Sequence, residues 1–153
     1  GKKITNASHW GHINFTKADI TFDGDAISTG NFIVDMTSIS VDDISGGGKN
    51  RLENHLKDDD FFSVDKFKNA ELEILEKSEM IDNKYLVEAN LTIKGITNPI
   101  TFEMTQLTDD SYKAKLIFDR SKYDVQYRSG SFFENLGDRL ILDDVELEVT
   151  LVK

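Results

Sequence analysis

The chain has 153 residues, of which 39% are hydrophobic and 30% are charged. This is an ordinary globular composition, and the length predicts a single domain over residues 1–153 with a sizeable core. Acidic residues outnumber basic residues by 28 to 18, and the resulting net charge of −10 disfavours binding to nucleic acids or anionic membranes. The absence of cysteine excludes disulfides, thiolate metal sites and thiol nucleophiles.

The N-terminal half shows the two-residue alternation of apolar and polar side chains that is typical of half-buried strands. Residues 13–22 alternate with one change of phase near Thr16, which indicates a bulge. Residues 23–25 predict a turn, and a second alternating run follows at 30–36. A weaker strand is expected over residues 70–74.

One segment predicts a helix, residues 50–62, because Leu52, His55 and Leu56 recur at helical spacing after a run of three glycines. Residues 95–99 are expected to form a short turn. The remaining alternating runs lie at 85–93, 100–104, 114–118 and 145–151. The pattern predicts an all-β fold, an antiparallel barrel of about eight strands with one short helix after the third strand, and the strand count favours a closed barrel.

The predicted interior is rich in aromatic residues, since the chain has ten phenylalanines and three methionines. A barrel of eight strands is either filled by its own side chains or holds one small ligand. The residue pattern leaves both interpretations open. A filled barrel would indicate a protein–protein interaction module, whereas a hollow one would indicate a binding protein.

Catalytic and metal-binding patterns are weak. His9 and His12 are three residues apart on a predicted strand and point to opposite faces, and His55 is isolated. The acidic run 58–60 and the pair Asp119–Arg120 leave a hydrolase as an alternative, although solvated loops and structural ion pairs explain them as well. We therefore predict no enzymatic activity, no metal and no cofactor.

Five short motifs occur in an order that resembles one family. They are residues 9–15 (HWGHINF), 28–39 (STGNFIVDMTSI), 55–67 (HLKDDDFFSVDKF), 91–100 (LTIKGITNPI) and 118–123 (FDRSKY). Taken together over nearly the whole chain, they resemble the YceI-like family of bacterial proteins.

The resemblance implies a lipocalin-like barrel that carries a polyisoprenoid or related long-chain amphiphile in its lumen without catalysis. A fatty acid or fatty amide in the same lumen is the alternative ligand, and a homodimer is left open. Family members are typically exported, so we expect a periplasmic or secreted protein whose export signal is absent from this sequence, which begins at Gly1.

Alternation and resemblance together predict the residues that line the ligand pocket: Phe15, Phe22, Phe32, Val34, Met36, Leu91, Phe102, Met104 and Phe118. Two structural roles are also expected. Phe61 and Phe62, with Asp60, should hold the helix against the barrel, and Arg120 should pair with a carboxylate such as Asp35.

Overall fold

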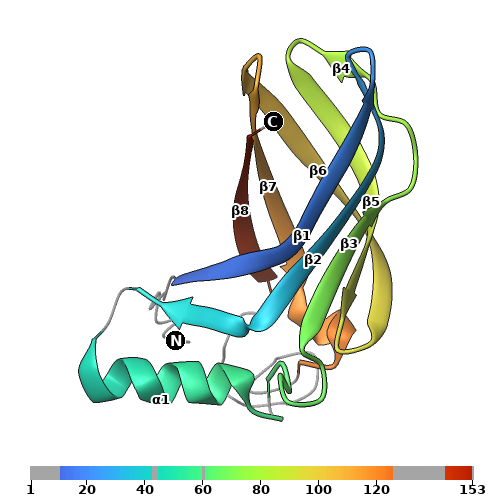
Figure 1. The fold of residues 1–153 in the computed structure, drawn as a ribbon. Coiled ribbons are helices and arrows are strands. Elements are labelled where there is room, and N and C mark those ends of the chain that lie inside the picture. The colour runs from blue at the N-terminus through green and yellow to red at the C-terminus, as the bar shows by residue number, and fades with distance from the viewer. Residues whose placement is uncertain (1–10, 43–44, 60, 126–143, 153) are drawn as a thin grey trace, which may run out of the picture.

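A computed structural model describes residues 11–42, 45–59, 61–125 and 144–152. Over these ranges the chain forms strands, one α-helix and one 3₁₀ helix (Figure 1). In chain order these are β1 (Gly11–Asp23), β2 (Ala26–Val41), α1 (Gly46–Lys57), β3 (Asn69–Ile74), β4 (Met80–Ile81), β5 (Lys84–Ile93), β6 (Ile96–Thr108), β7 (Ser111–Asp119), η1 (Arg120–Tyr123) and β8 (Asp144–Val152).

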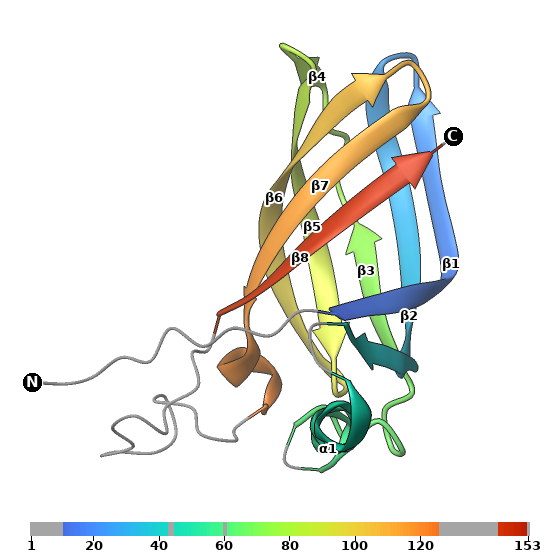
Figure 2. The same cartoon turned by 90° about the vertical axis from the view of Figure 1, so that its left-hand side faces the viewer.

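The strands form one curled antiparallel sheet in the order β1-β2-β3-β5-β6-β7-β8, with the short β4 paired to β5. Figures 1 and 2 show the sheet wrapped around a common axis, with α1 beneath one end. The predicted lipocalin-like fold class is therefore confirmed.

The sheet is a half-barrel rather than the closed barrel that the strand count favoured. Within the described ranges, no ladder joins β1 to β8, the two strands at the ends of the sheet order. The pairing of β1 with β2 shifts register in three places, between His12 and Asn14, Phe15 and Lys17, and Thr21 and Phe22. Such bulges bend the paired strands locally.

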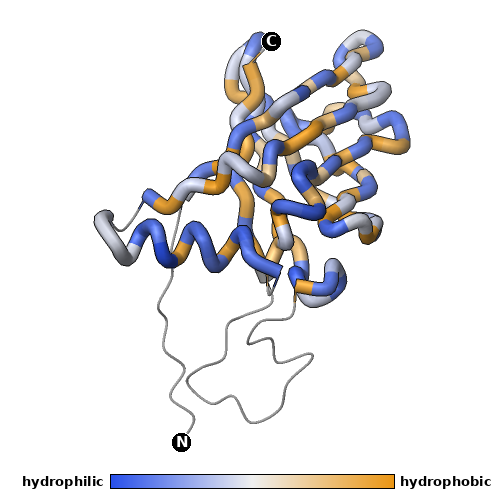
Figure 3. Tube along the Cα trace, turned by 60° about the horizontal axis from the view of Figure 1, so that its bottom comes forward, coloured by the Kyte–Doolittle hydropathy of each residue, from blue (hydrophilic) through white to orange (hydrophobic). Residues whose placement is uncertain are grey.

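The expected alternation is present along the strands. In β5 and β7 every second side chain is buried, and the intervening residues are exposed or partly exposed. Figure 3 shows the same alternation of hydrophobic and hydrophilic positions along the chain, and a mostly hydrophilic helix. The apolar side chains therefore line the inner face of the curl.

The helix differs from its prediction in both bounds and place. It begins at Gly46, inside the glycine run expected to precede it, and ends at Lys57 rather than at residue 62. It ends there because Asp58 has extended backbone angles, and the chain then folds back so that Val64 donates to the carbonyl of Lys57 at 2.9 Å. The helix follows β2, the second described strand rather than the third.

The turn predicted at 95–99 is also shorter than expected. It consists of Lys94 and Gly95 alone, both with positive φ (53° and 74°), as two-residue hairpin turns require. Pro99 instead lies inside β6, opposite Asn90 of β5.

Within the part of the chain that the structure describes, no helix has the length and apolar character needed to cross a membrane.

Candidate ligand-binding interior

Two hydrophobic clusters fill opposite ends of the curled sheet. The turn-end cluster includes Ile27, next to the β1–β2 turn, and the helix-end cluster includes Phe61 and Val64, which follow α1; Figure 1 shows this turn and α1 at opposite ends of the sheet. The buried members of the turn-end cluster are Ile27, Phe32, Ile74, Tyr85, Val87, Ala89, Phe102, Met104, Tyr112, Ala114 and Leu116. Those of the helix-end cluster are Met36, Phe61, Val64, Ala70, Leu91, Ile93, Phe118, Tyr123 and Val125.

Aromatic contacts draw the sheet together at the turn end. Phe22 of β1 stacks on Tyr112 of β7 with ring centroids 5.4 Å apart. Tyr85 lies 6.3 Å from Tyr112, and its hydroxyl donates to the carbonyl of Asp25 in the β1–β2 turn. Because Phe22 and Tyr112 belong to strands that are not neighbours in the sheet, this contact spans the interior.

The loop after α1 and the segment after β7 close the helix end. Phe61 is buried there, and Phe62 packs against the same cluster, as does Leu56 of α1; that these residues hold the helix stays a prediction. Asp60 lies outside the described residues. Arg120 is only 2% exposed; it donates to the carbonyl of Val125 at 3.0 Å, and its guanidinium carbon lies 5.7 Å from the centre of the Phe61 ring.

Asp35, the carboxylate suggested as a partner of Arg120, has a different partner among the described residues. Asp35 lies on β2 and accepts hydrogen bonds from the backbone N–H and the hydroxyl of Thr37, at 2.9 and 2.6 Å. One carboxylate oxygen of Asp35 is therefore hydrogen-bonded by Thr37, two residues further along β2. Arg120 instead donates to Val125 in the segment after η1.

The two clusters meet at three partly buried side chains. Leu72 of β3, Ile100 of β6 and Leu147 of β8 each pack against both clusters. The middle of the interior is therefore apolar but less completely buried than its two ends.

The inner face is most exposed along the two edge strands. On β8 the inward-facing residues Val145, Leu147, Val149 and Leu151 are all partly exposed, whereas their counterparts on β7 are buried. On β1, Phe15 is 41% exposed although it lies opposite Val34 and its ring centroid is 6.0 Å from that of the buried Phe32. We call these partly exposed inner residues of β1 and β8 the open seam: Ile13, Phe15, Ile20, Phe22, Val145, Leu147, Val149 and Leu151.

The predicted pocket residues all belong to the apolar inner face, but they differ in exposure. Phe22 and Val34 are partly buried, and Phe15 is exposed on the open seam. The others are buried in the two clusters: Phe32, Met36, Leu91, Phe102, Met104 and Phe118. Their proposed contact with a ligand stays a prediction.

A further cavity, which the sequence pattern did not indicate, lies where β6 and β7 separate. It has a volume of about 370 Å³, within the range of small-molecule sites. Its lining comes from the start of β6, the end of β7 and η1: Asn98, Pro99, Ile100, Thr101, Ile117, Phe118, Asp119, Lys122 and Tyr123.

Pro99 keeps the two strands from pairing at the far end of this separation. The ladder between β6 and β7 ends at Glu103–Lys115; in that register Thr101 would face Ile117, and Pro99 would face Asp119. Counting from the two-residue turn, the β5–β6 pairs alternate between hydrogen-bonded and non-hydrogen-bonded pairs, beginning with the hydrogen-bonded pair Ile93–Ile96. The pair of Asn90 with Pro99 is a non-hydrogen-bonded one. The nitrogen of Pro99 therefore faces β7 and not β5. Since proline has no N–H to donate, the ladder cannot continue through this position.

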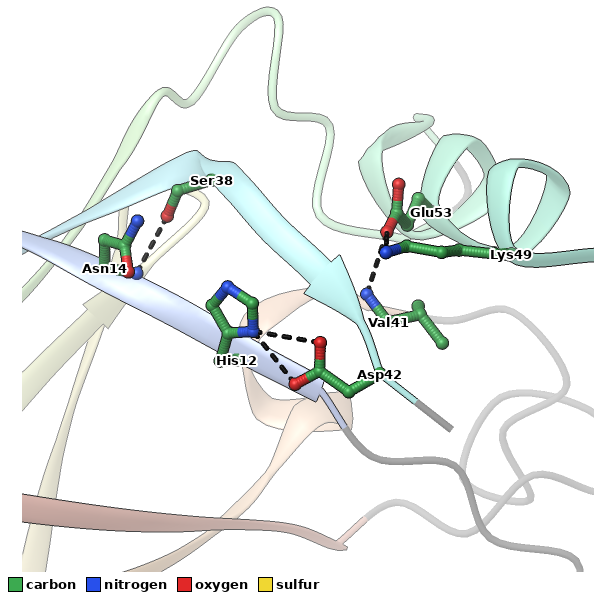
Figure 4. A network of polar contacts seen from close by, with 7 residues as sticks. All are labelled: His12, Asn14, Ser38, Val41, Asp42, Lys49 and Glu53. Atoms are coloured by element: carbon green, nitrogen blue, oxygen red, sulfur yellow. Dashed lines mark hydrogen bonds and ion pairs between the residues drawn. The ribbon is translucent and has the colours of Figure 1, made fainter. Parts of the chain in front are cut away.

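A polar network connects α1 to the edge of the sheet (Figure 4). Glu53 accepts from the backbone N–H of Val41 at 2.9 Å, and Lys49 lies 3.8 Å from the same carboxylate. His12 contacts Asp42 at 2.9 Å, and both side chains are largely exposed. The contacts of Glu53 join the helix to the end of β2, and the contact of His12 with Asp42 joins β1 to the residue after β2. The described ranges contain no group of three or more side chains that could hold a metal ion.

The other polar candidates have structural partners. Asp59 accepts from the hydroxyl of Ser63 at 2.7 Å, and this bond is the main reason why the pKa of Asp59 lies below its ordinary value. Asp119 accepts from the backbone N–H of Ser121 at 2.9 Å and so caps η1. The ring of His55 contacts that of Phe61 edge-on, with centroids 4.9 Å apart, and His9 lies outside the described residues.

A curled antiparallel sheet with an apolar inner face and a helix at one end defines the class of lipocalin-like proteins. Within that class the chain belongs to the YceI-like family, because the family's YceI-like domain matches residues 2–153. No curated protein matches the chain.

Of three similar solved structures, the first two agree with this fold. The YCEI protein of Campylobacter jejuni is 20% identical, with a TM-score of 0.68 over 99% of this chain and 89% of that chain. BcnA of Burkholderia cenocepacia is 20% identical, with a TM-score of 0.69 over 92% of this chain and 84% of that chain. A polyisoprenoid binding domain from Saccharophagus degradans, implicated in plant cell wall breakdown, is 12% identical, with a TM-score of 0.49 over 71% of this chain and 65% of that chain.

Proposed function

We propose that this protein binds a long-chain isoprenoid or a related amphiphile along the inner face of its half-barrel and carries it without catalysis, in the periplasm or outside the cell. Membership of the YceI-like family supports a lipid-binding role. The observation that carries the proposal is the open seam. Phe15 faces inward among apolar neighbours, yet 41% of its surface is accessible.

An apolar chain lying on the seam would be stabilised by the hydrophobic effect alone. Each buried CH₂ group contributes about 0.8 kcal/mol, so a chain of several isoprene units gains affinity without specific polar contacts. The seam offers apolar contacts from two strands, because Phe15 on β1 and Leu147 on β8 both face inward and are both accessible. The net charge of −10 favours an uncharged lipid over a fatty acid anion.

The proposal is tested by two measurements on natively purified protein. Mass spectrometry of the extracted lipid should identify a co-purified isoprenoid or similar chain. Titration with a fluorescent isoprenoid analogue should then show saturable binding that Phe15→Asp weakens at least tenfold, because the carboxylate would be desolvated beside hydrocarbon.

Leu86→Asp is the matched control. Leu86 is also an exposed apolar strand residue, 69% accessible, but it lies on the outer face of β5, and its substitution should leave binding unchanged. If wild-type protein binds no isoprenoid analogue and yields no lipid, the barrel is not a carrier. Equal loss of binding in both variants would place the ligand elsewhere than on the seam.

A further inference from the structure

We propose that the cavity between β6 and β7 receives the polar end of the bound amphiphile, and that this end is an uncharged hydroxyl or carbonyl group hydrogen-bonded to Tyr123. This inference rests on the proposed carriage of an amphiphile and adds the chemical class of its polar end. The hydrocarbon chain would extend from this cavity into the interior.

The Tyr123 hydroxyl has no hydrogen-bond partner among the described residues, although the side chain is only 1% exposed. Burial raises the pKa of Tyr123, and the neighbouring Asn98 side chain opposes that rise. Asn98 lies near enough to influence the hydroxyl, but its contact with Tyr123 does not reach hydrogen-bond geometry, and its amide nitrogen donates to the carbonyl of Lys122 at 3.0 Å. An unsatisfied hydroxyl in a buried position costs free energy, and a ligand that pairs with it recovers that cost.

The lining of the cavity favours an uncharged group. Its two ionisable side chains other than tyrosine are Lys122 and Asp119, one of each sign. Lys122 is exposed, and an oxygen of Asp119 already accepts from Ser121. The cavity therefore has no excess of cations with which to bind a carboxylate or a diphosphate. The hydroxyl of Tyr123, by contrast, can donate to a carbonyl oxygen, and it can either donate to or accept from an alcohol.

The cavity and the interior share side chains. Phe118 and Tyr123 line the cavity and are also buried members of the helix-end cluster, with ring centroids 5.8 Å apart. Ile100 lines the cavity and packs against both clusters. A chain whose polar end lies at Tyr123 would therefore have to displace or pass Ile100 to reach the middle of the interior, where Leu147 of the open seam also packs against both clusters.

Three ligands with the same chain test this inference: farnesene, which lacks a polar end, farnesol, which has a hydroxyl, and farnesyl diphosphate, which is anionic. We expect wild-type protein to bind farnesol about tenfold more tightly than farnesene, and farnesyl diphosphate no more tightly than farnesene. Tyr123→Phe removes only the unpaired hydroxyl, and should abolish the preference for farnesol while leaving the affinity for farnesene unchanged.

Tyr85→Phe is the control, since its hydroxyl is already bound to the Asp25 carbonyl; the preference for farnesol should persist in this variant. If all three ligands bind and Tyr123→Phe keeps the preference for farnesol, the polar end does not lie at Tyr123, and only this inference fails. Tightest binding of farnesyl diphosphate would overturn the uncharged class. If no ligand binds, the proposed carriage fails, and this inference fails with it.

Discussion

Two buried tyrosines on the inner side of the sheet have opposite hydrogen-bonding states. Tyr85 donates to the carbonyl of Asp25 and so connects β5 to the β1–β2 turn, whereas the hydroxyl of Tyr123 lacks a partner within the described ranges. Each side chain is 1% exposed. The difference therefore arises from the pairing of the hydroxyl and not from burial, which makes the two residues a matched pair for experiment.

The first prediction concerns the stability of these two variants. Tyr85→Phe should lower the free energy of unfolding by about 1 kcal/mol, because a hydrogen bond between the sheet and a turn is lost. Tyr123→Phe should leave that free energy unchanged or raise it, because an unsatisfied polar atom is removed from the interior. Urea unfolding of the ligand-free proteins measures both. A destabilised Tyr123→Phe would mean that the Tyr123 hydroxyl has a bonding partner in solution.

The second prediction is a loss of stability at alkaline pH. Burial raises the pKa of both Tyr85 and Tyr123 above 10.0, the ordinary value for tyrosine. Above that pH the unfolded chain releases the two protons while the folded chain retains them, so the contribution of these two tyrosines to stability is constant below pH 10.0 and falls as the pH rises beyond it. Thermal unfolding across this range should show the decline, and it should be shallower in the Tyr123→Phe variant. An equal slope in wild type and variant would contradict the raised pKa.

At the scale of elements, alternation predicted the strands well because one face of each strand is buried and the other solvated. The helix bounds were less predictable. Gly46 and Gly47 have low intrinsic helix propensity, yet they lie in the first turn of α1. The turn before β6 was predicted to be too long because Pro99 suggested a break in the strand. Proline is tolerated inside β6 because no neighbouring strand pairs with the position of its nitrogen.

The candidate site was predictable only in part. The alternating apolar residues of the inner face follow from the pattern, but their exposure does not, since it depends on whether β1 and β8 pair. Nothing in the local sequence distinguishes Phe15, accessible on the seam, from the buried Phe32. The cavity at Tyr123 was missed altogether, although a single proline in an alternating strand is a signal that can point to a separated ladder.

The third prediction tests the role of Pro99 in separating β6 from β7. Pro99→Val adds a backbone N–H that faces β7, and should extend the ladder beyond Glu103–Lys115 toward Asp119. Hydrogen exchange should show a protected amide at position 99, and the affinity for farnesol should fall as the cavity narrows. Pro99→Ala restores the same N–H with a smaller side chain and should give the same protection. Rapid exchange of the new amide in both variants would show that another constraint holds the strands apart.

For the whole molecule, the arrangement is an apolar interior packed at both ends and accessible along one side. Aromatic stacking of Phe22 on Tyr112 draws the turn end together, and Phe61 with Tyr123 occupies the helix end. Within the described residues, the strands on the accessible side, β1 and β8, each pair with one strand. The two edges that leave the inner face accessible are thus held on one side only, so a ligand lying between them would stabilise strands that lack a second pairing partner.

The last prediction is that an apolar ligand protects the edges of the sheet more than its centre. Binding to the native state alone raises the free energy of unfolding by RT ln(1 + [L]/Kd), or about 2.7 kcal/mol when the free ligand is at a hundred times Kd. That gain in the free energy of global unfolding slows amide exchange throughout the core.

Local opening of edge strands costs less free energy than global unfolding. Amides in β1 and β8 should therefore gain protection at ligand concentrations too low to change the exchange rates of amides in β5, which is paired on both sides. Hydrogen exchange with and without farnesene, followed by mass spectrometry, measures this order. Protection that appears first in α1, or equally in all strands, would contradict a ligand lying on the open seam.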